Sequence, residues 1–213
     1  MEANVQKQAT SKLCKPDEKI LVVAKDKLFS HTSVNGFLPL SNFDQYEEII
    51  KSNKQFLWRS TMETDVAYKQ ICPYLIFYFQ DTFFVMQRKS SASEQRLKNK
   101  FTMGSGGHLR QEDVDGRSIM AWAEREFNEE IVYNGSYTIH PFGIVNDESD
   151  LVGQVHMGLV FLLKGDSDDI AIRSELKQGS LMTLEECEQL FDIMESWSQF
   201  IFPYLKQHFA LLP

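Results

Sequence analysis

Two β-rich runs separated by a short polar break constrain the fold of this chain most. The runs are Tyr74–Phe79 and Phe83–Gln87, and Gln80, Asp81 and Thr82 join them. β-branched and aromatic runs on both sides of a polar break are typical of a β-hairpin. The sequence therefore predicts a hairpin near the middle of the chain, with a sheet built around it.

Strands and helices alternate after this hairpin. The predicted order is a Gly-rich turn at 104–108, a helix over 118–132, strands at 137–145 and 153–163, a helix that begins at Thr183 with Glu186 completing a capping box, and a helix over 196–209 interrupted or kinked near Pro203. This mixed order predicts an α+β fold, an α/β/α sandwich with a mixed sheet.

The chain divides into three predicted parts. Residues 1–18 are polar and are expected to form a flexible tail. Residues 19–70 are expected to form an N-terminal extension that packs on the core, and residues 71–213 to form the main domain. The sequence contains no internal repeat and no low-complexity linker.

Charge and composition exclude several classes of protein. The net charge is -8 and the pI about 5.2, which disfavours binding to nucleic acid or to an anionic membrane. The N-terminal segment has no apolar run after its charges, and the longest apolar stretches are only strand-length. Three widely spaced cysteines, Cys14, Cys72 and Cys187, form neither a disulfide framework nor a CxxC metal motif. We expect a cytoplasmic protein, and the sequence leaves open whether it forms a homodimer.

The segment Arg125–Glu130 carries the strongest chemical signal. On a helix, Glu126, Glu129 and Glu130 stand at i, i+3 and i+4, so three carboxylates project from one face. Their mutual repulsion would destabilise the helix unless a cation lay between them. Oxygen-rich sites suit Mg²⁺ or Mn²⁺, and Arg125 is spaced to orient Glu129. A solvated acidic helix face is the alternative interpretation.

Basic and glycine-rich residues precede this helix. Residues 88–100 contain five basic side chains, of which Arg88 is the first, and only one acid. Such a loop either is merely solvated or steers phosphate groups towards the Gly106-Gly107-His108 turn. His108 is a candidate phosphate-binding residue, and His156 on the later strand is more simply a sheet residue.

Arg125–Glu130 resembles the core of the Nudix box, Arg-Glu-apolar-any-Glu-Glu, and follows a hairpin and a Gly-Gly turn in the order of the Nudix fold. The resemblance spans about residues 72–195. It implies a metal-dependent hydrolase that cleaves a diphosphate bond of a phosphate-bearing small molecule. It also implies that Glu126, Glu129 and Glu130 are metal ligands, that Gly107 opens the box, and that Arg125 orients the acids.

The chain departs from the Nudix pattern at two places. Arg117 stands where the spacing from Arg125 requires a Glu, whereas Asp113 stands at the usual distance from Gly107. An insertion of about four residues accounts for this, with Asp113 or Glu112 replacing the acid; Asp113 is then an additional candidate metal ligand. Val132 replaces a glycine at the helix end, so the helix is expected to run slightly longer.

An acidic loop lies between the two later strands, at residues 146–150. Nudix enzymes commonly supply a further carboxylate from such a loop as ligand or general base, so Asp147 and Glu148 are candidates; an Asp-rich turn is the alternative. The loop, the strand after it and residues 68–74 also resemble a bacterial group of Nudix-type phosphoesterases. In that comparison Arg59, Glu63 and Lys69 help to close the substrate pocket.

Three functions are compatible with these sequence features. The first is metal-dependent hydrolysis of a nucleoside diphosphate-linked or related organic diphosphate. The second is a non-catalytic Nudix-like module that senses a ligand. The third is an isomerase like isopentenyl-diphosphate isomerase, for which Cys72 invites the comparison but the glycine-rich segment lacks the expected cysteine-histidine pattern.

Overall fold

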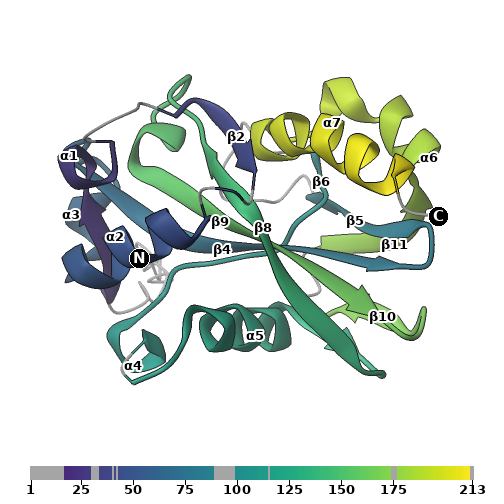
Figure 1. Cartoon of the computed structure of the whole chain (residues 1–213), viewed down its shortest axis with the longest axis horizontal. Helices are drawn as coiled ribbons and strands as arrows, with labels where there is room; N and C mark the ends of the chain where they lie inside the picture. Colours follow the sequence, from purple (N-terminus) through teal and green to yellow (C-terminus); the bar gives the residue numbers. More distant parts are fainter. Residues whose placement is uncertain are drawn as a thin grey trace, which may run out of the picture.

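The computed structural model describes residues 17–29, 34–39, 41, 43–88, 99–114, 116–173 and 177–211. A large mixed sheet forms the centre of the fold, and helices cover both of its faces (Figure 1). Its strand order is β11-β5-β4-β9-β8-β2, with β1 pairing β3 and β4, and β6 pairing β5. The predicted α+β sandwich is confirmed.

The strands and helices follow one another along the described chain with short connections. The strands are β1 (Lys19–Ala24), β2 (Gly36–Pro39), β3 (Gln55–Trp58), β4 (Tyr68–Phe79), β5 (Thr82–Arg88), β6 (Phe101–Thr102), β7 (Ile131–Tyr133), β8 (Tyr137–Asn146), β9 (His156–Gly165), β10 (Ile170–Ile172) and β11 (Lys177–Thr183). The helices are α1 (Lys25–Leu28), α2 (Phe43–Asn53), α3 (Arg59–Met62), α4 (Gln111–Val114), α5 (Ile119–Glu130), α6 (Leu184–Gln189) and α7 (Ser196–Ala210), with short 3₁₀ turns at Gly153–Val155 and Phe191–Ile193.

β4 is paired along both of its edges. It runs parallel to β9 from Gln70 to Tyr78, whereas its other edge is shared by two strands and a loop. β5 pairs only with the Tyr78–Phe79 end, and β1 pairs with Tyr68, Lys69 and Gln70. In the gap between them, Leu75 exchanges backbone hydrogen bonds with Ser105, of 2.8 and 3.0 Å. The glycine-rich loop is therefore part of the sheet edge, and its position is fixed.

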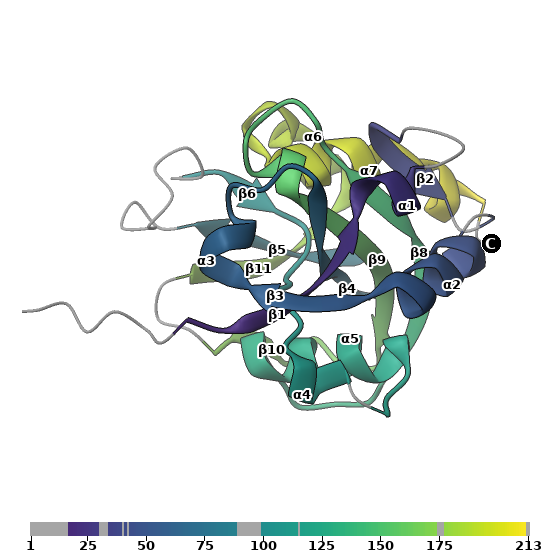
Figure 2. The ribbon, with the colours of Figure 1, turned by 90° about the vertical axis from the view of Figure 1, so that its left-hand side faces the viewer.

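Two apolar layers hold the helices against the sheet. The stripe Trp122, Ala123 and Phe127 of α5 is buried against one face, and α6 and α7 cover the other, as Figures 1 and 2 show. Burying a large apolar side chain contributes about 1.5–3 kcal/mol. The same stripe leaves the acidic side of α5 at the edge of the core.

Residues 19–70 join the main sheet instead of packing beside it. β1 pairs with β3 and β4. β2 pairs with β8 and forms one end of the strand order. The predicted boundary at residue 70 falls inside β4. The predicted tail lies outside the described residues except for Asp17 and Glu18.

Several local predictions can be compared with the structure. The hairpin is confirmed: β4 and β5 meet at a turn in which Gln80 has a φ of 53°. The capping box of Thr183 and Glu186 is confirmed as well. The helix predicted over 196–209 is present as α7, which runs through Pro203 from Ser196 to Ala210 without an interruption.

Two predicted boundaries are wrong for identifiable reasons. The helix over 118–132 was expected to run long, but it ends at Glu130 because Ile131, Val132 and Tyr133 pair with β10. The strand expected from residue 153 begins only at His156. The backbone N–H groups of Val155 and His156 instead donate to the carbonyl oxygens of Val152 and Gly153, which closes a 3₁₀ turn before the strand begins.

Candidate active site

Helix α5 presents the three box glutamates to different degrees. Its N-terminus is capped by Ser118, whose Oγ accepts a hydrogen bond from the backbone N–H of Ala121 (3.2 Å). Glu126 is buried with only 5% exposure, whereas the side chain of Glu129 is 53% exposed. Glu130 is half-buried at the helix end. The carboxylates therefore extend from the protein interior to the surface along one turn of helix.

Arg125 holds this set of acids together. Its Nη2 lies 2.7 Å from Glu126 Oε2 and 3.3 Å from Asp113 Oδ2, and its Nη1 lies 2.5 Å from Glu129 Oε1. The guanidinium is itself largely buried, with 14% of the side chain exposed. Ion pairs removed from water in this way fix side-chain positions more firmly than surface pairs do.

The displaced acid of the box has a structural counterpart. Asp113 is buried and receives hydrogen bonds from the backbone N–H and Nε of Arg110, both at 3.0 Å, besides its contact with Arg125. Glu112 is 69% exposed and approaches Arg110 only to 3.5 Å. Of the two acids that the sequence offered, Asp113 is the one placed against Arg125. Burial alone would raise the pKa of Asp113, but the hydrogen bonds and charges of the two arginines outweigh burial and lower it.

Gly106 and Gly107 bring the loop as close to the sheet and helix as a backbone can come. A Cβ at Gly107 would stand 2.2 Å from Glu126 Oε1, and a Cβ at Gly106 would stand 1.9 Å from the carbonyl oxygen of Pro73. No other amino acid fits at either position without displacing its neighbours. The loop thereby closes over Glu126.

Burial controls the ionisation of Glu126. It raises the pKa of this carboxyl from 4.5 to about 7, in part opposed by the adjacent Arg125 and reinforced by Glu129 and Glu130. A buried carboxylate among like charges is stabilised in its ionised form by a cation. The donor set of three carboxylates fits a hard divalent ion such as Mg²⁺ or Mn²⁺, and Glu126, Glu129 and Glu130 are the residues that could hold it.

The acidic loop after β8 forms a second charged cluster. Glu148 pairs with Lys25 at 2.6 Å and with Lys69 at 2.8 Å, and Lys69 is completely buried, donating to the carbonyl of Gly153 at 2.7 Å. Burial alone would raise the pKa of Glu148, but the two lysines lower it. Asp147 is also buried, and its Oδ1 accepts from the backbone N–H of Ser149. Lys69 is thus an anchor for this loop.

Three further side chains converge beside the box, from three separate segments. One ligand atom each of Cys72, His108 and His156 lies within 4.8 Å of the others, and the Nε2 atoms of the two histidines are 3.1 Å apart. Sequence reasoning took these residues one at a time. The signal that links them is the strand register: Gln70 of β4 pairs with His156 of β9, so Cys72 is a diagonal neighbour of His156.

The two arginines predicted to bind substrate occupy different places. Arg59 forms ion pairs with Glu18 (2.9 Å) and Glu63 (3.0 Å), and its charge contributes to lowering the pKa of His108. Arg88 forms an ion pair with Glu195 at the start of α7, on the sheet face opposite α5. The basic residues between 89 and 98 lie outside the described residues.

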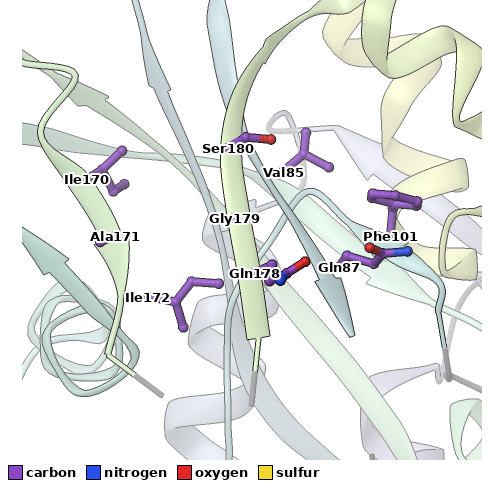
Figure 3. Close-up of a pocket in the computed structure, with 9 residues that line it drawn as sticks. All are labelled: Val85, Gln87, Phe101, Ile170, Ala171, Ile172, Gln178, Gly179 and Ser180. Atoms are coloured by element: carbon purple, nitrogen blue, oxygen red, sulfur yellow. The ribbon is translucent and has the colours of Figure 1, made fainter. Parts of the chain in front are cut away.

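An open groove of about 550 Å³ lies beside β10, β11 and the end of β5 (Figure 3). Its walls include Phe101, Gln87 and Gln178, and none of the nine lining residues is charged. Ile172 at one side pairs with Ile131, the residue that follows the last box glutamate. The groove offers contacts to an organic group but no metal ligands.

Within the part of the chain that the structure describes, each helix is too short or too polar to cross a bilayer. No family model matches the chain. Solved structures do match it: Tm1382, a candidate Nudix hydrolase, superposes with a TM-score of 0.76 at 27% identity, covering 90% of this chain and all of that one. The Nudix domain of NrtR from Shewanella oneidensis, crystallised with ADP ribose, superposes with a TM-score of 0.52 at 13% identity over 66% of this chain and 88% of that one.

The fold, the box and the glycine loop closed over Glu126 place this chain in the Nudix hydrolase superfamily. It is similar over nearly its whole length to one curated protein, YmaB of Bacillus subtilis, at 29% identity, with 90% of this chain and 99% of YmaB covered.

Proposed function

We propose that the protein hydrolyses a phosphoanhydride bond in a nucleoside diphosphate-linked compound or a related organic diphosphate. The observation that carries the proposal is the contact of Gly107 with Glu126, because it joins loop and helix into one acidic site with no room for a side chain between them. A structural or purely solvated acidic face needs no such approach.

The residues of α5 have two proposed roles, metal binding and orientation of the metal ligands. Glu126, Glu129 and Glu130 hold Mg²⁺ or Mn²⁺, which when bound neutralises phosphate oxygens and lowers the pKa of an attacking water. Arg125 orients Glu126 and Glu129. Asp113, with both oxygens engaged by arginines, positions Arg125; its predicted role as a metal ligand remains untested.

The site and its surroundings support the proposed substrate class. Phosphates approach the backbone of Gly106 and Gly107, where side chains are absent, and the uncharged groove is available to the organic group. The ADP ribose bound by the NrtR domain is a nucleoside diphosphate linked to a sugar, so compounds of this class come first in an assay. Substrate contacts by Arg59 and Arg88 stay predictions, as do a cytoplasmic location and the absence of nucleic-acid partners.

The general base is proposed to come from the loop after β8. Glu148 is held by two lysines that lower its pKa, which disfavours proton uptake at this carboxylate near neutral pH. Asp147 is the better candidate of the two on this ground, and Glu148 serves to fix the loop.

The proposal is tested by a turnover screen of the full chain with and without Mg²⁺ or Mn²⁺. The panel contains nucleotide sugars, dinucleotide cofactors, dinucleoside polyphosphates, nucleoside triphosphates and isoprenoid diphosphates. We expect metal-dependent release of a phosphate-bearing product, absent in Glu129→Gln and present in the control Glu124→Gln on an exposed side of the same helix. Rearrangement of an isoprenoid diphosphate without loss of phosphate would indicate an isomerase. Ligand-induced stabilisation without turnover would indicate a sensor module.

A further inference from the structure

Cys72, His108 and His156 form a compact group of soft and borderline donors that the carboxylate site does not use. They come from β4, the glycine-rich loop and β9, and their three ligand atoms lie within 4.8 Å of one another. In a tetrahedral zinc site with bonds of about 2.0–2.3 Å, ligand atoms stand about 3.3–3.7 Å apart. In the metal-free chain the two Nε2 atoms are 3.1 Å apart, a hydrogen-bonding distance slightly shorter than this, and the limit of 4.8 Å is longer, so an ion would bring the three donors to this spacing by small side-chain movements.

The hydrogen bonding of His156 selects the tautomer that a metal needs. Its Nδ1 lies 2.8 Å from the carbonyl oxygen of Val152, which can only accept, so Nδ1 carries the proton. In the neutral ring Nε2 is then the acceptor of the hydrogen bond with His108 Nε2 (3.1 Å), and its lone pair is directed at the space shared with His108. A ligating histidine whose other nitrogen donates to a backbone carbonyl is the usual outer-shell arrangement of protein metal sites.

His108 meets the same requirement by its position. Its Nε2 lies 3.1 Å from His156 Nε2, and an ion between the two rings would take the place of the proton in that hydrogen bond. His108 is also half-buried instead of fully enclosed, which gives an ion a path of entry.

The thiol of Cys72 is better suited to a metal than to catalysis by itself. Burial raises the pKa of this thiol, with the charge of Glu126 acting in the same direction, so the metal-free group is protonated and a weak nucleophile. Metal binding deprotonates a coordinating thiol outright. Within the described residues Cys72 and Cys187 are both unpaired thiols, and only Cys72 has histidines beside it.

We propose that Cys72, His108 and His156 bind one transition-metal ion of borderline softness, zinc foremost, at a site distinct from the box glutamates. Cysteine and histidine ligands select this class of ion, whereas the carboxylates of α5 select Mg²⁺ or Mn²⁺. Three protein ligands leave the fourth position of a tetrahedral ion open to water or to a substrate atom. The ion joins the loop that carries Gly106 and Gly107 to two central strands, so the site also fixes the entrance of the box.

The test is a Co²⁺ titration of the full-length, metal-free protein, followed by visible and near-ultraviolet absorption. The proposal predicts one Co²⁺ per chain with a sulfur-to-cobalt charge-transfer band and the strong visible bands of tetrahedral cobalt. Zn²⁺ should displace Co²⁺, and excess Mg²⁺ should not. A wild-type protein with no charge-transfer band would overturn the proposal without any variant being needed.

Matched variants locate the ion. Cys72→Ser should remove the charge-transfer band, and His108→Ala should weaken Co²⁺ binding by at least about tenfold. Cys187→Ser and Cys14→Ser control for the other thiols, and His140→Ala controls for an exposed histidine on β8. A band that survives Cys72→Ser, or disappears in Cys187→Ser or Cys14→Ser, would contradict the assignment. Because His108 is half-buried, its variant still tests the site should Cys72→Ser fail to fold.

Failure of this proposal and failure of the hydrolase proposal are separable. Cobalt absorption in Glu129→Gln should equal that of the wild type, since Glu129 is not among the three donors. Mg²⁺-dependent turnover in a protein without the cobalt band would remove the transition-metal site and leave the hydrolase. A cobalt band in a protein without Mg²⁺-dependent turnover would support the transition-metal site and contradict the hydrolase proposal.

Discussion

Arg125 Nη2 lies 2.7 Å from Glu126 Oε2 and 3.3 Å from Asp113 Oδ2, so one guanidinium nitrogen joins the acid of the preceding loop to the buried acid of the box. An acid therefore lies against Arg125 although Arg117, and not a glutamate, stands at the usual spacing. From Asp113 the chain reaches the start of α5 through the end of α4 and the turn at Gly116, which has a φ of 69°.

Glu129→Gln is expected to reduce kcat by at least about 100-fold, since it removes a charged metal ligand. The side chain is 53% exposed, so the melting temperature should change little. Steady-state kinetics and thermal unfolding check both statements. Glu124→Gln serves as the matched control and should keep wild-type kinetics. Full activity in Glu129→Gln would remove this residue from the site.

Asp113→Asn is expected to destabilise the fold by about 1–3 kcal/mol and to lower kcat, because the largely buried Arg125 and the partly exposed Arg110 lose their counter-charge. Denaturant unfolding and kinetics on the same preparation measure the two effects. Glu112→Gln, at the exposed neighbouring position, should change neither. If the two variants behaved alike, the contact between Asp113 and Arg125 would have no functional role.

The raised pKa of Glu126 predicts how stability varies with pH in the metal-free protein. Because its pKa of about 7 in the folded state exceeds the ordinary glutamate value of 4.5, the stabilising contribution is complete below about pH 4.5 and is lost as pH rises through about 7. Relative to Glu126→Gln, the wild type should lose on the order of 1–3 kcal/mol across this window. Denaturant unfolding of both proteins along a pH series checks this. A constant difference between them would contradict it.

Glu148→Gln is expected to destabilise the protein by about 3–5 kcal/mol, since it leaves the ammonium group of the completely buried Lys69 without its counter-charge. Lys69→Met should restore part of this loss in the double variant. Equilibrium unfolding of both single variants and the double variant gives the coupling energy. Additive effects would show that the pair is not an energetic unit.

Local elements of the fold were predicted correctly where a single sequence pattern specifies them. The apolar runs on both sides of the polar break at 80–82 and the Thr183–Glu186 spacing each specify one backbone hydrogen-bonding arrangement, and both are present. The end of α5 was misplaced because Ile131 and Val132 suit a helix by periodicity but are β-branched. Because they pair with Ala171 and Ile172 of the later strand β10, they form a strand and the helix ends before them.

The site was predictable to the extent that it is encoded on one helix. Helical spacing places Glu126, Glu129 and Glu130 on one face of a helix, and the resemblance to the Nudix box predicts that they are metal ligands. The partners that come from elsewhere cannot be predicted in this way, since Glu148 reaches Lys25 and Lys69 across the fold, and Cys72, His108 and His156 meet only through strand register and a loop. No spacing in the sequence reports such contacts.

The most direct test of the central claim is turnover in water enriched with heavy oxygen, using the best substrate from the panel and Mg²⁺. Hydrolysis of a phosphoanhydride predicts that one phosphate-bearing product gains one heavy oxygen atom, measured by mass spectrometry, and that chelation of the metal stops both product release and incorporation. Cleavage without metal, or ligand binding without any labelled product across the whole panel, would contradict the claim.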